Sequence, residues 1–306
     1  MKIKKYPTVC LALLLATGLG TTACNGKGAK NTSSEDTLQA VTSAAVSNTE
    51  EPDTLETSRK ECVLTAKDSS LTCNISVDWP TENDALAMGV RQYIAEELAA
   101  CYLPTMQEED TKAYPKYKGS TDDIRKMLNF YGQGTMKMLR ETLTEFKNDG
   151  REDLPQLACE IKIRKTAEED KYVIYTSTTY SYLGGAHPSS SGSSAIISKI
   201  TNKEVKKTVD ESQLKALQPL LKKGLVTYFK DCGETDVTEE TVKDLLLLTG
   251  NLIPLPVSTL TLEADGVHFI YQQYEIAPYA VGMPEFVIAY KDIIPYLTQE
   301  AKDILQ

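Results

Sequence analysis

The sequence is poor in the residues and motifs that carry most catalysis at neutral pH. It has two histidines and one tryptophan among 306 residues, and most of its aromatic residues are its 16 tyrosines. It contains no HExxH, GxxxxGK, GxSxG or GxGxxG pattern, so no zinc-protease helix, nucleotide loop or nucleophile elbow is indicated. It also has no CxxC pair and no EF-hand spacing. We therefore expect neither a metal nor another cofactor.

Positive charge is also scarce. The chain has 33 basic and 43 acidic residues, for a net charge of −10. The first 23 residues hold three lysines and no acid, so the remainder carries a net charge of −13. Such a body repels phosphate groups, and we expect no nucleic-acid partner. Its charge would suit a basic partner.

The N-terminus has the pattern of an export signal. A lysine-rich start is followed by an apolar run at 8–19, which is too short for a comfortable membrane span, and then by small residues before Cys24. This arrangement resembles a bacterial lipoprotein signal, in which the cysteine is lipidated. It predicts a signal peptide at 1–23, a disordered polar tether at 24–58, and a lipid-anchored protein of the cell envelope facing the periplasm or exterior. The alternative is ordinary cleavage after Ala23, which would leave Cys24 a free thiol.

The remaining cysteines suit an exported protein. Cys62 and Cys73 flank two short strand-like runs joined by turn residues at 67–70, which predicts a Cys62–Cys73 disulfide. Any pairing among Cys101, Cys159 and Cys232 stays open.

Hydrophobic periodicity predicts helices first, then sheet, then helices, then sheet again. An α+β fold follows, with helices packed on a largely antiparallel β-sheet. Helices are expected from Thr81 to Pro104, at 120–148, 211–229 with a break at Pro219, 238–248, 292–297 and 298–305. Strands are expected in a hairpin at 62–78 and at 159–164, 171–182, 194–200, 204–208, 259–263, 268–275 and 285–290.

Two segments carry the candidate site residues. In the first, Gly184 and Gly185 precede His187, and a serine-rich stretch follows. A Ser–His pair for acyl transfer is conceivable there, although sequence neighbours alone do not establish attack geometry. The second segment holds Tyr274, Glu275 and Tyr279, and tyrosine offers both a stacking face and a hydroxyl to a ligand. The plainer interpretation is that these residues only pack, as we expect of His268 in its strand.

Taken together, the two segments resemble the exported domain family found in the lysozyme-sensing anti-sigma factor RsiV. The matching stretches are Tyr182-Leu-Gly-Gly-Ala-His187 and Tyr274-Glu-Ile-Ala-Pro-Tyr279-Ala-Val-Gly282, about ninety residues apart. The part before residue 165 is similar to the companion domain that also precedes the catalytic part of the deacetylase PdaC. The resemblance implies two closely associated subdomains, an N-terminal one at 59–165 and an RsiV-like one at 166–306. It also implies that Gly184, Gly185, His187, Tyr274, Glu275 and Tyr279 contact a ligand.

The resulting hypothesis is a non-catalytic, lipid-anchored envelope module that binds a lysozyme-like basic protein or a peptidoglycan-related ligand. Two alternatives stay open. One is an envelope hydrolase that acts on cell-wall peptide or glycan through His187. The other is a structural envelope lipoprotein in which the motifs only hold the fold.

Overall fold

The computed structural model describes residues 54–102, 116–258 and 260–306. The predicted signal peptide at 1–23, Cys24 and most of the tether lie outside the described residues and stay predictions. The end of the predicted tether is already part of the fold. Leu55 is buried, its N–H donates to Glu168 at 2.9 Å, and its carbonyl accepts from Lys165 at 2.7 Å.

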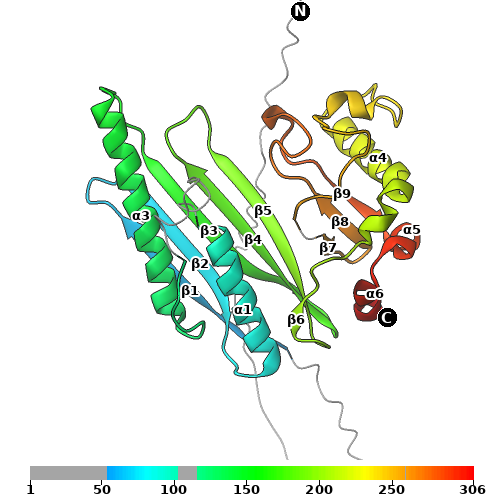
Figure 1. Ribbon diagram of the computed structural model, residues 1–306, viewed down its shortest axis with the longest axis horizontal. Helices are drawn as coiled ribbons and strands as arrows, with labels where there is room; N and C mark the ends of the chain where they lie inside the picture. The colour runs from blue at the N-terminus through cyan, green and yellow to red at the C-terminus, as the bar shows by residue number, and fades with distance from the viewer. Residues whose placement is uncertain (1–53, 103–115, 259) are drawn as a thin grey trace, which may run out of the picture. The chain divides into compact units, whose positions relative to one another are not determined.

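The first half of the described chain builds a six-stranded mixed sheet in the order β1-β2-β3-β4-β5-β6 (Figure 1). Its strands are β1 (Thr57–Thr65), β2 (Leu71–Pro80), β3 (Leu157–Glu168), β4 (Tyr172–Tyr182), β5 (Ser189–Ser198) and β6 (Lys203–Glu204). All neighbours are antiparallel except β2 and β3, which run parallel. A parallel pair needs a long crossover, and the described residues between β2 and β3 contain two helices.

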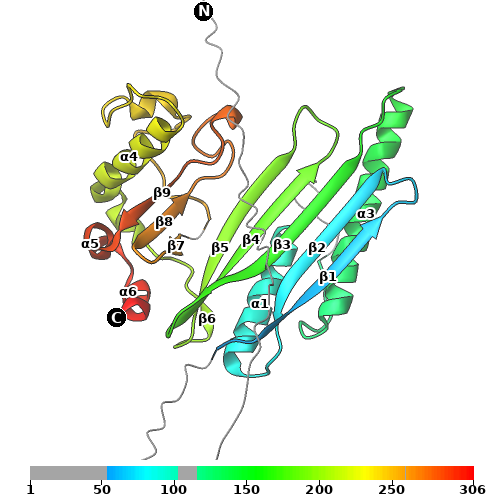
Figure 2. The same ribbon diagram turned by 180° about the vertical axis from the view of Figure 1, so that it is seen from behind.

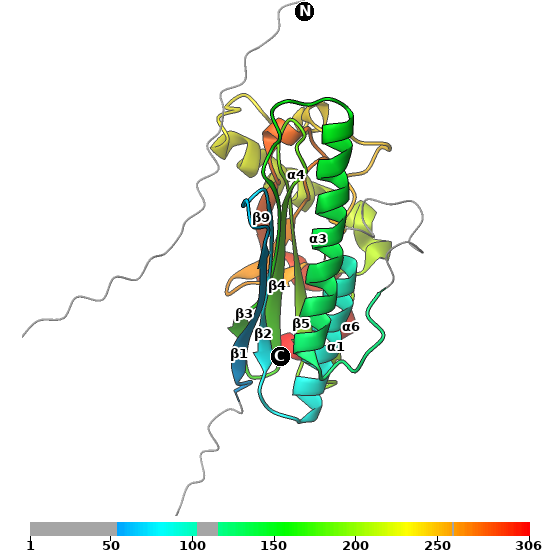
Figure 3. The ribbon, with the colours of Figure 1, turned by 90° about the vertical axis from the view of Figure 1, so that its left-hand side faces the viewer.

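These two helices, α1 (Ala85–Ala100) and α3 (Ile124–Asn148), cover one face of the six-stranded sheet (Figure 3). Each begins at an aspartate that accepts a bond from the third backbone N–H of its helix: Asp84 caps α1 and Asp123 caps α3. Their apolar sides pack on inward-facing residues of β2, β3 and β4 to form a first hydrophobic core. The two predicted helices are therefore confirmed, and each begins four residues later than expected.

The second half forms a three-stranded antiparallel sheet, β7 (Thr261–Leu262), β8 (Gly266–Ile270) and β9 (Glu285–Ala289), against helix α4 (Leu214–Asp231). Short helices α5 (Tyr290–Ile293) and α6 (Gln299–Leu305) close the chain, and 3₁₀ turns lie at Glu211–Gln213, Val242–Leu245, Tyr279–Val281 and Ile294–Tyr296. The apolar residues of this half form a second core. The architecture is α+β with helices packed on sheets, as the sequence predicts.

The two cores share strands. Val173 and Tyr175 of β4 point into the first core, whereas Ile174 between them points into the second. Seen from behind, β4 and β5 lie between the rest of the large sheet and the β7–β9 sheet (Figure 2). Residues 54–306 form one compact unit, and the division expected at residue 165 falls inside β3.

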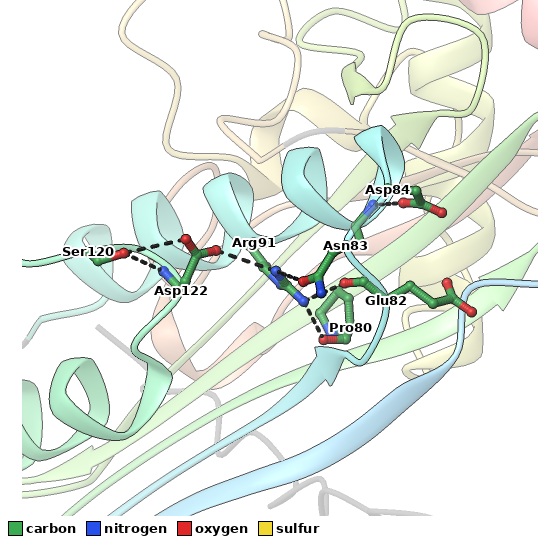
Figure 4. A network of polar contacts seen from close by, with 8 residues as sticks. Pro80, Glu82, Asn83, Asp84, Arg91, Ser120 and Asp122 are labelled. Carbon is green, nitrogen blue, oxygen red and sulfur yellow. Dashed lines mark hydrogen bonds and ion pairs between the residues drawn. The ribbon is translucent and has the colours of Figure 1, made fainter.

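A buried arginine ties the start of α1 to its surroundings (Figure 4). The Arg91 guanidinium donates to the carbonyls of Pro80 and Glu82, to Asn83 at 2.9 Å and to Asp122 at 3.3 Å. It also lies 5.5 Å from the centre of the Trp79 ring. These contacts join β2, α1 and the segment before α3. The sequence analysis did not single out this residue.

Several element predictions were wrong in detail. The expected helix at 238–248 is only the 3₁₀ turn Val242–Leu245, and the expected strand at 204–208 is only two residues long. Pro219 does not break α4, which continues through it. The serines after His187 form the first half of β5 rather than a solvated loop, because they pair with β4 from Ser181↔Ser189 onward.

The expected Cys62–Cys73 disulfide is absent, and all five cysteines among the described residues are free thiols. The hairpin itself is confirmed, but its register pairs Cys62 with Ile75 and Cys73 with Leu64. The two cysteines are therefore diagonal neighbours. Diagonal Cα atoms lie roughly 7–8 Å apart, beyond the usual reach of a disulfide at about 7 Å.

Candidate functional site

The two sequence segments that carry the candidate residues meet in space. The loop at 183–188 joins β4 to β5, and the second segment at 272–282 joins β8 to β9. The side chains of His187, Tyr274 and Tyr279 come together there, and we call these three residues the aromatic cluster. The sequence motifs predicted the residues but not their contact.

The cluster is organised by His187. Its ring stacks on Tyr279 with centroids 3.7 Å apart, and Tyr274 completes the group at 5.7 Å from Tyr279. The carbonyl of Pro188 accepts from His187 Nδ1 at 2.9 Å and from Tyr279 Oη at 3.1 Å. Since a carbonyl only accepts, Nδ1 carries the proton, and Nε2 of the neutral ring can accept from Tyr274 Oη at 3.4 Å.

Tyr274 is held in an unusual position. Its φ angle is +65°, a conformation that side-chain-bearing residues rarely adopt, and 56% of its surface is exposed. An exposed aromatic ring at a strained backbone position gains little from packing. Such strain is typical of functional segments rather than of residues that only fill space.

The two glycines have different roles. Gly184 has φ +81°, and a Cβ there would lie 2.5 Å from the Phe146 ring and 2.7 Å from Pro155. Gly184 therefore allows the loop to rest on α3. A Cβ on Gly185 would meet nothing within 4 Å, although its carbonyl accepts from Tyr182 Oη at 3.2 Å. Both glycines shape the loop that presents His187.

Glu275 braces the loops around the cluster. One carboxylate oxygen accepts from the N–H of Val257 and the other from the N–H of Gln272, each at 2.7 Å. Burial raises the pKa of Glu275, and the two backbone donors partly offset that effect. Each carboxylate oxygen of Glu275 thus binds a backbone group and braces the loops around the aromatic cluster, and the ligand contact that the resemblance implies for this residue stays a prediction.

Two glutamines that sequence analysis missed connect the segments. Gln272 donates to the carbonyl of Gly192 at 2.6 Å and accepts from its N–H at 2.9 Å, while Gln273 accepts from Ser190 N–H at 3.2 Å. These amides satisfy backbone groups on the outer edge of β5, where an unpaired strand would otherwise invite association. The side chains thereby fix the second segment against β5.

An apolar rim lies beside the cluster. It consists of Leu247, Leu252 and Val257, all exposed, with Val257 81% exposed. Leu247 and Leu252 line a cavity of about 370 Å³ together with Pro254 and Glu275. Large apolar side chains in exposed loops are detectable in the sequence, but nothing there indicates that they gather around Glu275.

The site has no evident nucleophile. Among the described residues, His187 makes its side-chain hydrogen bonds to Pro188 and Tyr274, and none to a serine hydroxyl. The nearby Ser191 hydroxyl is paired with Thr179 instead. The residues the structure describes also contain no cluster of three metal-ligating side chains and no helix suited to crossing a membrane.

Comparison with known proteins identifies a family for part of the chain. Residues 190–291 match the family described as "Protein of unknown function (DUF3298)". The match includes Tyr274, Glu275 and Tyr279 and begins three residues after His187. A search of the curated proteins finds no match.

Two solved structures share the fold. One is a DUF3298 family member from Bacteroides fragilis, with 17% identity and a TM-score of 0.58 over 82% of this chain and 96% of the other. The second is a DUF3298 family protein from Pseudomonas aeruginosa, with 14% identity and a TM-score of 0.53 over 82% and 97%. At these identities the likeness concerns the fold alone.

Proposed function

We propose that this protein is a lipid-anchored, non-catalytic module of the cell envelope that binds a basic, lysozyme-like protein. The aromatic cluster and the apolar rim form its contact surface. The observation that carries the proposal is the aromatic cluster itself, assembled from segments about ninety residues apart with Tyr274 exposed on a strained backbone. The envelope location rests on the signal-like N-terminus and the ligand class on the RsiV resemblance.

A protein ligand fits the surface better than a glycan. Exposed apolar side chains gathered in one place are typical of protein-binding sites, and tyrosines often dominate their binding energy. The cluster and the rim combine these features. The net charge of −13 that remains after removal of residues 1–23 would speed the approach of a basic protein, while the rings and the rim would supply the specificity.

Lysozyme binding to immobilised protein, measured by biosensor at low and at physiological salt, tests the proposal. We expect binding that persists at physiological salt and weakens at least about tenfold in Tyr274→Gly. Glycine tolerates φ +65°, so this change removes the ring without adding backbone strain. Met88→Ala, an equally exposed position on α1, is the matched control and should bind normally.

The outcomes separate the alternatives. Absence of binding, or binding only at low salt, would refute the lysozyme-like ligand. Binding to peptidoglycan fragments that depends on Tyr274 would mean that the same surface recognises a cell-wall ligand instead of a protein. Turnover of those fragments that disappears in His187→Ala would support the hydrolase instead.

A further inference from the structure

Two buried cysteines lie side by side on the parallel strands. Cys73 of β2 is the direct register partner of Cys159 of β3. Paired residues on neighbouring strands face the same side, and both thiols point into the first core, with exposures of 0% and 4%. Neighbouring strands are about 4.8 Å apart, within the Cα separation that disulfides span, about 4.4–6.8 Å.

The other cysteines are placed for different contacts. A Cβ on Gly132 would lie 2.9 Å from the Cys62 sulfur, so that thiol faces α3. The Cys101 thiol contacts Glu97 at 3.3 Å and Ser177 at 3.6 Å, and burial followed by Glu97 raises its pKa to about 12. Cys232 follows α4 in the other half of the chain. Cys73 and Cys159 are the one pair among the described cysteines joined by strand register.

The two thiols contact each other in the folded core. Its pKa is lowered, first by a hydrogen bond from the Cys159 thiol and further by Thr135, against the opposing effect of burial. The pKa of Cys159 is raised by that same contact and by burial. The shared contact shows that the two sulfurs lie within reach of each other in the closed core.

We propose that Cys73 and Cys159 form a disulfide that cross-links β2 and β3 when the chain folds in an oxidising environment. The oxidant is a small or protein disulfide. The Cys73 thiolate attacks one oxidant sulfur and releases the other as a thiolate, which gives a mixed disulfide. Cys159 then loses its proton and displaces the remaining oxidant sulfur. Two protein thiols are oxidised, and one disulfide is reduced to two thiols.

The burial of both sulfurs sets the timing of this step. No oxidant reaches them once α1 and α3 have closed over the sheet, so the bond forms during folding. It encloses residues 74–158, which contain both helices of the crossover. In the chain-entropy description, a cross-link stabilises the folded state more when it encloses a longer loop. This bond would also hold together the parallel strands β2 and β3, which otherwise assemble slowly.

Peptide mapping tests the pairing directly. The full chain is refolded from denaturant with oxidised and reduced glutathione, free thiols are alkylated, and the protein is digested with trypsin without reduction. Cys62, Cys73 and Cys159 fall in separate tryptic peptides, 61–67, 68–91 and 152–162. We expect 68–91 linked to 152–162. Alkylation of both Cys73 and Cys159, or linkage of either to another peptide, would overturn the proposal.

Thermal melting provides a second readout. Protein refolded from denaturant in the presence of a phosphine should melt roughly 5–15 °C lower than protein refolded with the glutathione pair. Cys73→Ala should melt at the same temperature with and without the phosphine, because the link cannot form. Cys62→Ala is the matched control and should keep the difference. A wild-type melting temperature that is the same with and without the reductant would contradict the cross-link.

Discussion

His268 shows how one side chain can make the stability of this fold depend on pH. It lies on the central strand β8, and its ring nitrogens are 3.4 Å from Glu263 and 3.4 Å from Glu285. The contact with Glu285, reinforced by the charges of both acids, raises the pKa of His268 against the effect of burial. The same contact lowers the pKa of Glu285. When protonated, His268 thus forms ion pairs with Glu263 and Glu285 in addition to packing in its strand.

Replacing His268 by glutamine should lower stability at pH 5.5 and have less effect at pH 9. The folded-state pKa is above the unfolded value near 6.5, so the contribution is present below pH 6.5 and is lost as pH rises through the folded pKa. At the acid end it fades again as Glu285 takes up a proton. Both carboxylates are about half exposed, so we expect about 1 kcal/mol or less.

Urea unfolding midpoints of both proteins at the two pH values measure this difference. Glu285→Gln is the partner control and should remove most of the same pH dependence. A His268→Gln variant that is equally destabilised at pH 5.5 and pH 9 would show that the ring acts by packing alone.

At the scale of elements, helix α1 packs on the sheet through a glycine. A Cβ on Gly89 would lie 2.1 Å from the carbonyl oxygen of Asn202, in the turn between β5 and β6. That turn is fixed by Asn202 at φ +56° and by its N–H bond to Ser198 at 2.8 Å. Backbone cannot yield as a side chain can, so the close approach requires glycine.

The change Gly89→Ala should therefore lower stability, whereas the same replacement usually raises it in the interior of an exposed helix. In an exposed helix interior alanine is about 1 kcal/mol better than glycine, but here we expect a loss of roughly 1–3 kcal/mol from overpacking. Denaturant unfolding measures it, with the neighbouring exposed Met88→Ala as a control within about 0.5 kcal/mol. A stabilised Gly89→Ala would mean that α1 moves freely over the turn.

Elements with strong local signals were predictable from the sequence. The two helices expected from Thr81 and from residue 120 are present, although each begins four residues later, and the alternation at 159–164 marks a strand that the structure confirms and extends. The serines at 189–193 were not predicted as strand, because their β structure comes from pairing with β4 and from the glutamines that cap them. The secondary structure of such a segment is determined by the strands and side chains that contact it in the fold, and its composition does not reveal them.

The candidate site divides in the same way. His187, Tyr274 and Tyr279 were found from their motifs, and the structure brings them together. The bracing role of Glu275 and the rim at 247–257 depend on loops whose paths no periodicity encodes. Likewise, the hairpin that suggested Cys62–Cys73 was correctly placed, but its register decides which thiols are neighbours, and a two-residue offset is enough to separate them.

At the scale of the whole molecule, two cores are joined through β4 and β5. Alternate residues of these strands face opposite sides, so neither core can be removed without exposing the other face of the same strands. The structure places 54–306 in one unit, whereas the sequence predicts subdomains at 59–165 and 166–306. We infer from the shared strands that the two cores unfold together.

Trp79 allows this inference to be tested, because it is the only tryptophan and lies buried in the first core. Leu225→Ala in α4 leaves a cavity in the second core and should cost about 2–5 kcal/mol. If unfolding is cooperative, the Trp79 fluorescence midpoint falls together with the far-UV circular dichroism. Leu139→Ala in α3, equally buried in the first core, should shift both signals alike. A Trp79 transition that responds to Leu139→Ala but not to Leu225→Ala would instead show two independently folding domains, because only a core that unfolds separately could lose Leu225 without affecting Trp79.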